Sequence, residues 1–177
     1  MAHRALTGVL LVGGASTRFG SPKALARFRG ETLAERAWRL LGEACEERIA
    51  VGKLTDRLEL PFELRDDGSD VRAPLAGLVA GLRAAAHDVA VVIPVDVPLL
   101  DAAALRTLGA ACREAAVLPS GPLPGAYAKA ALPLLEDALA RGELRLRDAV
   151  ARLDAASVEL DASLLVNVNT PSDLEAL

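Results

Sequence analysis

The segment Val89–Pro94 is an unbroken apolar run, and it constrains the fold of this chain more than any other feature. A strand with one solvated face alternates apolar and polar residues, whereas a strand covered on both faces reads as a continuous apolar run. The segment Leu6–Val12 is nearly as apolar. The sequence therefore predicts a mostly parallel central sheet with helices on both of its faces.

Helical patterns separate the predicted strands. Thr32 and Glu35 have the spacing of a capping box, and an apolar stripe at helical spacing follows them, which predicts a helix from about residue 32. A second helix is expected over residues 74–86, and further short strands over residues 48–51 and 62–65. This alternation is typical of βαβ units.

Composition limits the classes of protein that remain. A chain of 177 residues that is 52% hydrophobic and 25% charged suits one well-buried domain. A formal net charge of -4 argues against a general nucleic-acid binder, and no apolar run approaches the roughly 18 residues of a membrane span. Cys45 and Cys112 have neither metal-site spacing nor partners for a disulfide framework, so we expect buried thiols in a cytoplasmic protein.

Residues 11–25 join the first predicted strand to a loop that suits a triphosphate. Gly13 and Gly14 let the backbone come close to an anion, because they lack a Cβ and free several N–H groups. Arg18 and Lys23 add two cations to the same loop. The predicted ligand is a nucleotide.

Two common phosphate loops do not match this segment. The Walker pattern needs Gly-Lys-Ser/Thr, but Pro22 precedes Lys23 and removes a backbone donor. The dinucleotide fingerprint fails because Ala15 stands where its second glycine belongs. A dehydrogenase-like function therefore loses its main support.

Asp96 follows the central predicted strand and is the candidate metal ligand. Open α/β sheets bind ligands at the carboxyl ends of their strands, so Asp96 and the glycine loop should converge there. A carboxylate beside a triphosphate calls for an intervening cation, and Mg²⁺ prefers oxygen ligands. The alternative is that Asp96 caps a helix beginning near Asp101 or merely ends the strand.

The chain resembles a known family along nearly its whole length. The loop fits Leu-x-Gly-Gly-x-Ser-x-Arg-x-Gly-x-x-Lys-x-Leu at every fixed position, and a segment Asp-x-x-x-Pro-Leu-x-Gly joins Asp70 to Gly77. Residues 92–100 match a Val-x-Pro-x-Asp-x-Pro-x-Leu strand end, residues 141–148 a Gly-Glu-x-Arg-x-x-Asp segment, and residues 166–171 an Asn-x-Asn-Thr-Pro motif. In these motifs the chain is similar to the molybdenum cofactor guanylyltransferases.

The resemblance implies a single-domain, three-layer Rossmann-like nucleotidyltransferase fold over residues 1–177, with nucleotide bound by the N-terminal half and acceptor by the C-terminal half. It implies transfer of GMP from GTP to the phosphate of molybdopterin with release of pyrophosphate, Mg²⁺ as cofactor, and transient contacts with other cofactor-biosynthesis proteins or molybdoenzymes. The implied catalytic residues are Arg18, Lys23 and Asp96, with Asp96 as metal ligand. The implied nucleotide site comprises Leu11, Val12, Gly13, Gly14, Lys23, Asp70, Gly77 and Asp96, and the implied acceptor site Asn167 and Asn169.

Two departures from the family pattern keep other functions open. Gly52 stands where the family commonly has a nucleotide-binding Asn, so CTP is an alternative to GTP. Pro119-Ser120-Gly121 replaces a longer hairpin and a His, so another phosphorylated small molecule is an alternative acceptor. A catalytically inactive nucleotide-binding protein is a further alternative. For the Asn motif, the alternative is a structural role next to Thr170, which can cap the last helix.

Overall fold

The structure is a computed structural model that describes residues 4–13 and 19–177. A seven-stranded sheet has the order β5-β4-β1-β6-β8-β7-β9, and every neighbouring pair is parallel except the two that involve β8. The strands are β1 (Leu6–Val12), β4 (Glu47–Gly52), β5 (Leu64–Asp66), β6 (Val89–Pro94), β7 (Ala115–Leu118), β8 (Gly121–Ala128) and β9 (Ala155–Ser157). The predicted mostly parallel sheet is confirmed.

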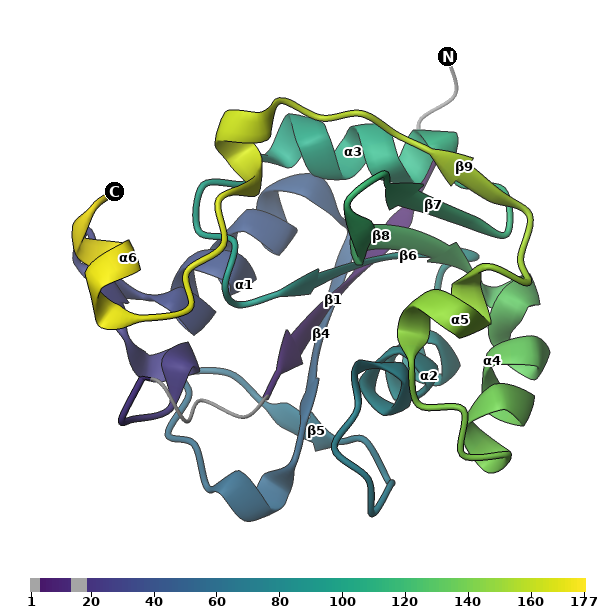
Figure 1. Cartoon of the computed structure of the whole chain (residues 1–177), viewed down its shortest axis with the longest axis horizontal. Coiled ribbons are helices and arrows are strands. Elements are labelled where there is room, and N and C mark those ends of the chain that lie inside the picture. The colour runs from purple at the N-terminus through teal and green to yellow at the C-terminus, as the bar shows by residue number, and fades with distance from the viewer. Residues whose placement is uncertain (1–3, 14–18) are drawn as a thin grey trace.

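Helices cover both faces of this sheet and make a three-layer α/β/α arrangement (Figure 1). One face carries α1 (Leu33–Ala44) and α3 (Ala102–Ala111), and the other carries α2 (Pro74–Ala84), α4 (Leu132–Ala140) and α5 (Leu146–Val150). The short helix α6 (Pro171–Glu175) follows at the C-terminal end. Each described helix is shorter or more polar than a membrane span requires.

The core lies in two layers, one on each side of the sheet. Along β1 the side chains alternate between them, so that Leu10 packs in the layer of α1 and α3, while Val9 and Leu11 pack in the layer of α2 and α4. Every residue of β1 is buried. This two-sided burial explains why β1 and β6 are uniformly apolar in sequence.

Side-chain caps set the starts of several helices. Thr32 and Glu35 form the predicted capping box of α1, and Thr170 forms another with Asp173 at α6. Asp101 caps α3 by accepting from the Ala104 N–H at 2.7 Å. The second predicted helix begins at Pro74 as expected but ends at Ala84, because Ala85 adopts an extended conformation.

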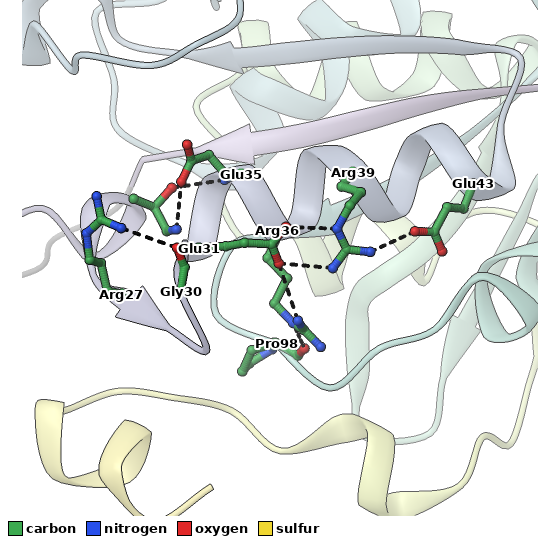
Figure 2. A network of polar contacts seen from close by, with 9 residues as sticks. Arg27, Gly30, Glu31, Glu35, Arg36, Arg39, Glu43 and Pro98 are labelled. Carbon is green, nitrogen blue, oxygen red and sulfur yellow. Dashed lines mark hydrogen bonds and ion pairs between the residues drawn. The ribbon is translucent and has the colours of Figure 1, made fainter.

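A polar network holds α1 to the short hairpin that precedes it (Figure 2). The hairpin comprises β2 (Arg27–Phe28) and β3 (Glu31–Thr32). Arg39 on α1 donates to both carboxylate oxygens of Glu31 at 2.8 and 3.0 Å, and this hydrogen bonding lowers the pKa of Glu31. These bonds tie the hairpin to α1.

Both cysteines are free thiols, and the predicted burial is confirmed for Cys112 but only in part for Cys45. Cys112 is buried and Cys45 is half-buried. Burial raises the pKa of the Cys45 thiol to about 12 and that of the Cys112 thiol to about 11. Both thiols are therefore protonated at neutral pH and poor nucleophiles.

Candidate functional site

The carboxyl ends of β1, β4 and β6 meet at one edge of the sheet. Val12 pairs in register with Gly52, and Leu11 pairs with Pro94, so the loops after these three strands begin side by side. Gly13 leaves β1 with a φ of +153°, a conformation that side chains rarely adopt. The edge is the place where open α/β sheets bind ligands.

Lys23 and Asp96 face each other across this edge. Lys23 opens a short 3-10 turn (Lys23–Leu25) after the loop from β1, and Asp96 lies in the turn after β6. Lys23 Nζ lies 3.1 Å from Asp96 Oδ2 and 3.4 Å from Asn169 Oδ1. The Lys23 ammonium therefore contacts a carboxylate and an amide that come from two other, distant parts of the chain.

Neighbouring segments fix the backbone around Asp96. The Val168 N–H donates to the Asp96 carbonyl at 2.9 Å, which holds the C-terminal strand-like segment against the turn. Arg36 of α1 donates from Nε to the Pro98 carbonyl at 2.6 Å, as Figure 2 shows. Since Asp101 caps α3, the alternative of a capping role for Asp96 is wrong.

Two adjoining cavities open at the same edge. The α2 cavity, of about 210 Å³, is mainly apolar and is lined by Leu11, Val12, Gly13, Val51, Gly52, Lys53, Asp67, Arg72, Ala73, Pro74, Gly77, Pro94 and Leu123. The Lys23 cavity, of about 590 Å³, is lined by Gly13, Pro22, Lys23, Ala24, Asp56, Leu58, Arg72, Pro94, Val95 and Asp96. Gly13, Arg72 and Pro94 belong to both walls, so one elongated ligand can extend from the first cavity into the second.

Further charged pairs line these cavities. Lys53 Nζ lies 2.6 Å from Asp67 Oδ1 on the wall of the α2 cavity. Arg72 makes two hydrogen bonds to the carboxylate of Asp56, at 2.5 and 3.0 Å, and these bonds lower the pKa of Asp56. Sequence reasoning missed all four residues. The position of Lys53 directly after β4 is the one signal that could have indicated it, by the strand-end rule used for Asp96.

Most of the described residues predicted for the site come together here. Lining residues among those predictions are Leu11, Val12, Gly13, Lys23, Gly77 and Asp96, and Asn169 contacts Lys23. Asp70 is exposed and lines neither cavity, and Asn167 is exposed beside the buried Val168. The predicted contributions of Gly14 and Arg18 lie outside the described residues.

Two glycines are explained by close backbone packing. A Cβ on Gly52 would lie 2.1 Å from the Val12 carbonyl oxygen, so no side chain fits where the family commonly has Asn. A Cβ on Gly77 would lie 2.8 Å from a methyl group of Leu11, so this glycine lets α2 approach β1 at the floor of the cavity. The departure at Gly52 is therefore a requirement of this backbone.

Asp96 is the predicted metal ligand, and its carboxylate is of the oxygen type that Mg²⁺ prefers. Within the described ranges no group of three or more His, Cys, Asp or Glu side chains could hold a metal ion. Mg²⁺ is commonly held by one or two carboxylates together with substrate phosphates. A single carboxylate that lines a cavity beside a lysine fits that pattern.

Comparison with known proteins adds an independent finding. Residues 8–157 match the model of the MobA-like NTP transferase domain. A probable molybdenum cofactor guanylyltransferase of Deinococcus radiodurans is 40% identical, over 97% of this chain and 93% of that protein. A molybdenum cofactor guanylyltransferase of Burkholderia ambifaria is 34% identical, over 97% and 95%. The crystal structure of molybdopterin-guanine dinucleotide biosynthesis protein A from Archaeoglobus fulgidus superposes with a TM-score of 0.79 at 26% identity, covering 96% of this chain and 95% of the other.

Proposed function

The chain belongs to the MobA-like NTP transferase domain family, and from this premise we propose that it transfers GMP from GTP to the phosphate of molybdopterin. The products are molybdopterin guanine dinucleotide and pyrophosphate. The names of the similar proteins from Deinococcus and Burkholderia support this choice of nucleotide and pathway. The observation that carries the proposal is the 3.1 Å approach of Lys23 Nζ to Asp96 Oδ2 at the ligand-binding edge.

The shapes of the two cavities suggest how GTP lies in the site. The α2 cavity is apolar enough for a base, with Leu11 and Val51 from two strands and Leu123 from β8 on its walls. The triphosphate then extends past Gly13 into the Lys23 cavity. There the Gly13 backbone and the Lys23 ammonium face the phosphates.

In this proposal Lys23 and Asp96 have different electrostatic roles, one toward phosphate and one toward Mg²⁺. Lys23 neutralises the α-phosphate, where negative charge is concentrated during transfer, and Arg18 is proposed for the β- and γ-phosphates. Asp96 would hold Mg²⁺, which when bound would neutralise phosphate oxygens near the leaving group. In the structure Lys23 bonds to Asp96, so phosphates compete with that carboxylate for the same ammonium.

The reaction requires no strong base from the protein. A phosphate oxygen of molybdopterin attacks the α-phosphorus, a new P–O bond forms, and the bond to the β-phosphate oxygen breaks in line as pyrophosphate leaves. The attacking phosphate monoester is already anionic near neutral pH. Positioning and charge neutralisation therefore account for the catalysis.

We place the acceptor, molybdopterin, beside the C-terminal segment of Asn167 and Asn169, which contacts the Asp96 turn. Val168 anchors the segment of Asn167 and Asn169 to the Asp96 turn by its N–H. Asn169 accepts from Lys23 through Oδ1, and its backbone N–H donates to Asp173 Oδ2 at 2.8 Å. Amide side chains here can donate to and accept from the polar edge of a pterin.

A substrate panel tests the proposal. Pyrophosphate release is measured with GTP, CTP, ATP and UTP, each with and without molybdopterin and Mg²⁺. The mass of the pterin product is determined by mass spectrometry. We expect release only with GTP, acceptor and Mg²⁺ together, and a product heavier by one GMP. Acceptor-dependent release with CTP but not with GTP, or no release with any nucleotide, would overturn the proposal.

A further inference from the structure

Arg72 lies where the two cavities of the candidate site meet. Of the charged side chains that the structure describes, it is the one that lines both the α2 cavity and the Lys23 cavity. The other two residues shared by both walls are Gly13, which follows β1, and Pro94, which ends β6. Arg72 belongs instead to the loop before α2. A ligand that extends from one cavity into the other therefore passes this arginine.

The family resemblance gives Arg72 no role. It stands at a variable position of the Asp-x-x-x-Pro-Leu-x-Gly segment, between Asp70 and Pro74. Among the described residues its one hydrogen-bond partner is Asp56. The Arg72 side chain is 55% exposed, and an ion pair this open to solvent contributes little to stability. The stability of the fold therefore gives little reason for an arginine at this position.

The charges that line the two cavities cancel among the described residues. Three cations line the walls, and each pairs with a carboxylate: Lys23 with Asp96, Lys53 with Asp67, and Arg72 with Asp56. A triphosphate brings several negative charges into these surroundings. It must therefore draw on donors that the ion pairs leave unused.

Arg72 keeps such donors. Its guanidinium carries five N–H groups in a fixed plane, and the contact with Asp56 uses one on Nη1 and one on Nη2. Lys53 has only three N–H groups, already donates to Asp67 and to the Ser69 carbonyl, and is 11% exposed. Arg72 can therefore donate to a phosphate without first giving up its carboxylate partner.

We propose that Arg72 donates to the α-phosphate of the bound nucleotide, with the N–H groups that Asp56 leaves unused. The inference rests on the proposed function, because it takes the base to lie in the α2 cavity and the triphosphate in the Lys23 cavity. The ribose and the α-phosphate then lie at the junction of the two cavities, which Arg72 lines. Arg72 is a phosphate-binding residue that the sequence motifs do not reveal.

Two variants distinguish this contact from a purely structural ion pair. Replacing Arg72 alone would leave Asp56 uncompensated beside the phosphates, so the comparison is made in protein without that carboxylate. Asp56→Asn and the double variant Asp56→Asn/Arg72→Gln both lack the ion pair and differ only in the guanidinium. The Kd for GTP is measured with Mg²⁺ and without molybdopterin by titration calorimetry, and folding is checked by circular dichroism.

We expect the double variant to bind GTP roughly 10- to 100-fold more weakly than Asp56→Asn, because it lacks a hydrogen bond between charged groups. Equal affinities of the two folded variants would overturn the inference. Asp56→Asn/Arg57→Gln is the matched control, since Arg57 is exposed, adjacent to Asp56 and lines neither cavity. It should bind GTP like Asp56→Asn. An equal loss in this control would show a long-range effect of charge and would also overturn the inference.

The length of the phosphate chain tests where Arg72 binds. The same two variants are titrated with GTP, GDP and GMP. We expect a similar fold-loss for all three, because each carries the α-phosphate. A loss confined to GTP would place the contact at the far end of the triphosphate and would contradict the position of Arg72 at the junction.

The outcomes separate this inference from the proposed function. Wild-type protein that binds no GTP would contradict the proposed function itself. Wild-type protein that binds GTP, together with equal affinities of Asp56→Asn and Asp56→Asn/Arg72→Gln, would overturn the role of Arg72 alone.

Discussion

At the scale of single residues, the proposed transfer depends on two opposite charges, Lys23 and Asp96, that meet over the carboxyl edge of the sheet. The side chains of Lys23 and Asp96 are 17% and 26% exposed, so both reach the cavity while partly shielded from water. In such surroundings a charge acts more strongly on a phosphate than it does in bulk solvent. Neither group packs in the core, and replacing either leaves both core layers intact.

We therefore expect Lys23→Ala and Asp96→Ala to fold normally and to lose almost all nucleotidyl transfer, by about 10²- to 10³-fold each, because each removes one contact to developing charge. Turnover is measured by pyrophosphate release and folding by circular dichroism. Arg83→Ala, which removes an exposed cation of α2 paired with Glu136, is the control. Wild-type turnover in either site variant would exclude the assigned role.

At the scale of elements, the approach of β4 to β1 determines what can stand at Gly52. Because a Cβ there would lie 2.1 Å from a backbone oxygen, Gly52→Ala must separate two central strands. We expect a loss of about 3 kcal/mol in the free energy of unfolding, at the upper end for overpacking, measured by urea titration.

Gly121→Ala is the matched control for this prediction. Its Cβ would meet only the end of the Arg147 side chain, at 3.7 Å. The change should stay within about 0.5 kcal/mol. Equal stabilities of the two variants would show that the strands adjust to a side chain at Gly52.

The hydrogen bonds at the start of α6 depend on the ionisation of Asp173, so the conformation of Asn169 and Thr170 should depend on pH. Backbone N–H groups of Asn169 and Thr170 donate to Asp173 and lower its pKa, with a smaller contribution from the charge of Lys23. A lowered pKa means that the stabilisation is present above the ordinary Asp value and is lost as the pH falls through the folded value.

The amide resonances of Asn169 and Thr170 should therefore stay native-like from pH 7 to about 4 and shift only in stronger acid. Heteronuclear NMR spectra recorded along a pH titration check this expectation. In Asp173→Asn the acid-dependent shift should vanish. A midpoint at or above the ordinary Asp value in wild-type protein would contradict the assigned capping role.

Different elements were predictable to different degrees from the sequence. The bounds of β1 and β6 follow from their own apolar runs, and the start of α1 from its capping box. The third strand was expected over residues 62–65 but is β5, Leu64–Asp66. An edge strand this short is defined by its register with β4 rather than by its own pattern.

The residues of the candidate site also differ in how far they could be predicted from the sequence. Asp96 and Lys23 could be brought together in advance, because one rule places loops at the carboxyl ends of parallel strands. Asp67 could not be chosen among the carboxylates of its loop. Asp66, its neighbour, caps backbone N–H groups of Leu54 and Gly68 instead. Only the folded backbone decides which of two adjacent carboxylates faces the cavity.

At the scale of the whole molecule, one sheet edge carries both cavities, so a ligand that fills them should stabilise the entire domain. At a free concentration of about 100 times Kd, a ligand specific for the folded state adds about 2.7 kcal/mol. For a domain of this size we expect GTP with Mg²⁺ to raise Tm by about 5–10 °C, measured by scanning calorimetry.

Removing the ion or changing the nucleotide should reduce this effect. With EDTA the same GTP concentration should raise Tm much less, because Asp96 then faces the triphosphate without an intervening cation. NAD should leave Tm unchanged. A shift by GTP that is independent of Mg²⁺ would contradict the assignment of Asp96 to a metal.

The position of the transferred label tests the central claim most directly. The protein is incubated with molybdopterin, Mg²⁺ and GTP labelled at either the α- or the γ-phosphate, and the pterin product is isolated. We expect the α-label to appear in the pterin in a 1:1 ratio to released pyrophosphate, and the γ-label to appear only in pyrophosphate. Transfer of the γ-label to the pterin, or no transfer of either label, would contradict it.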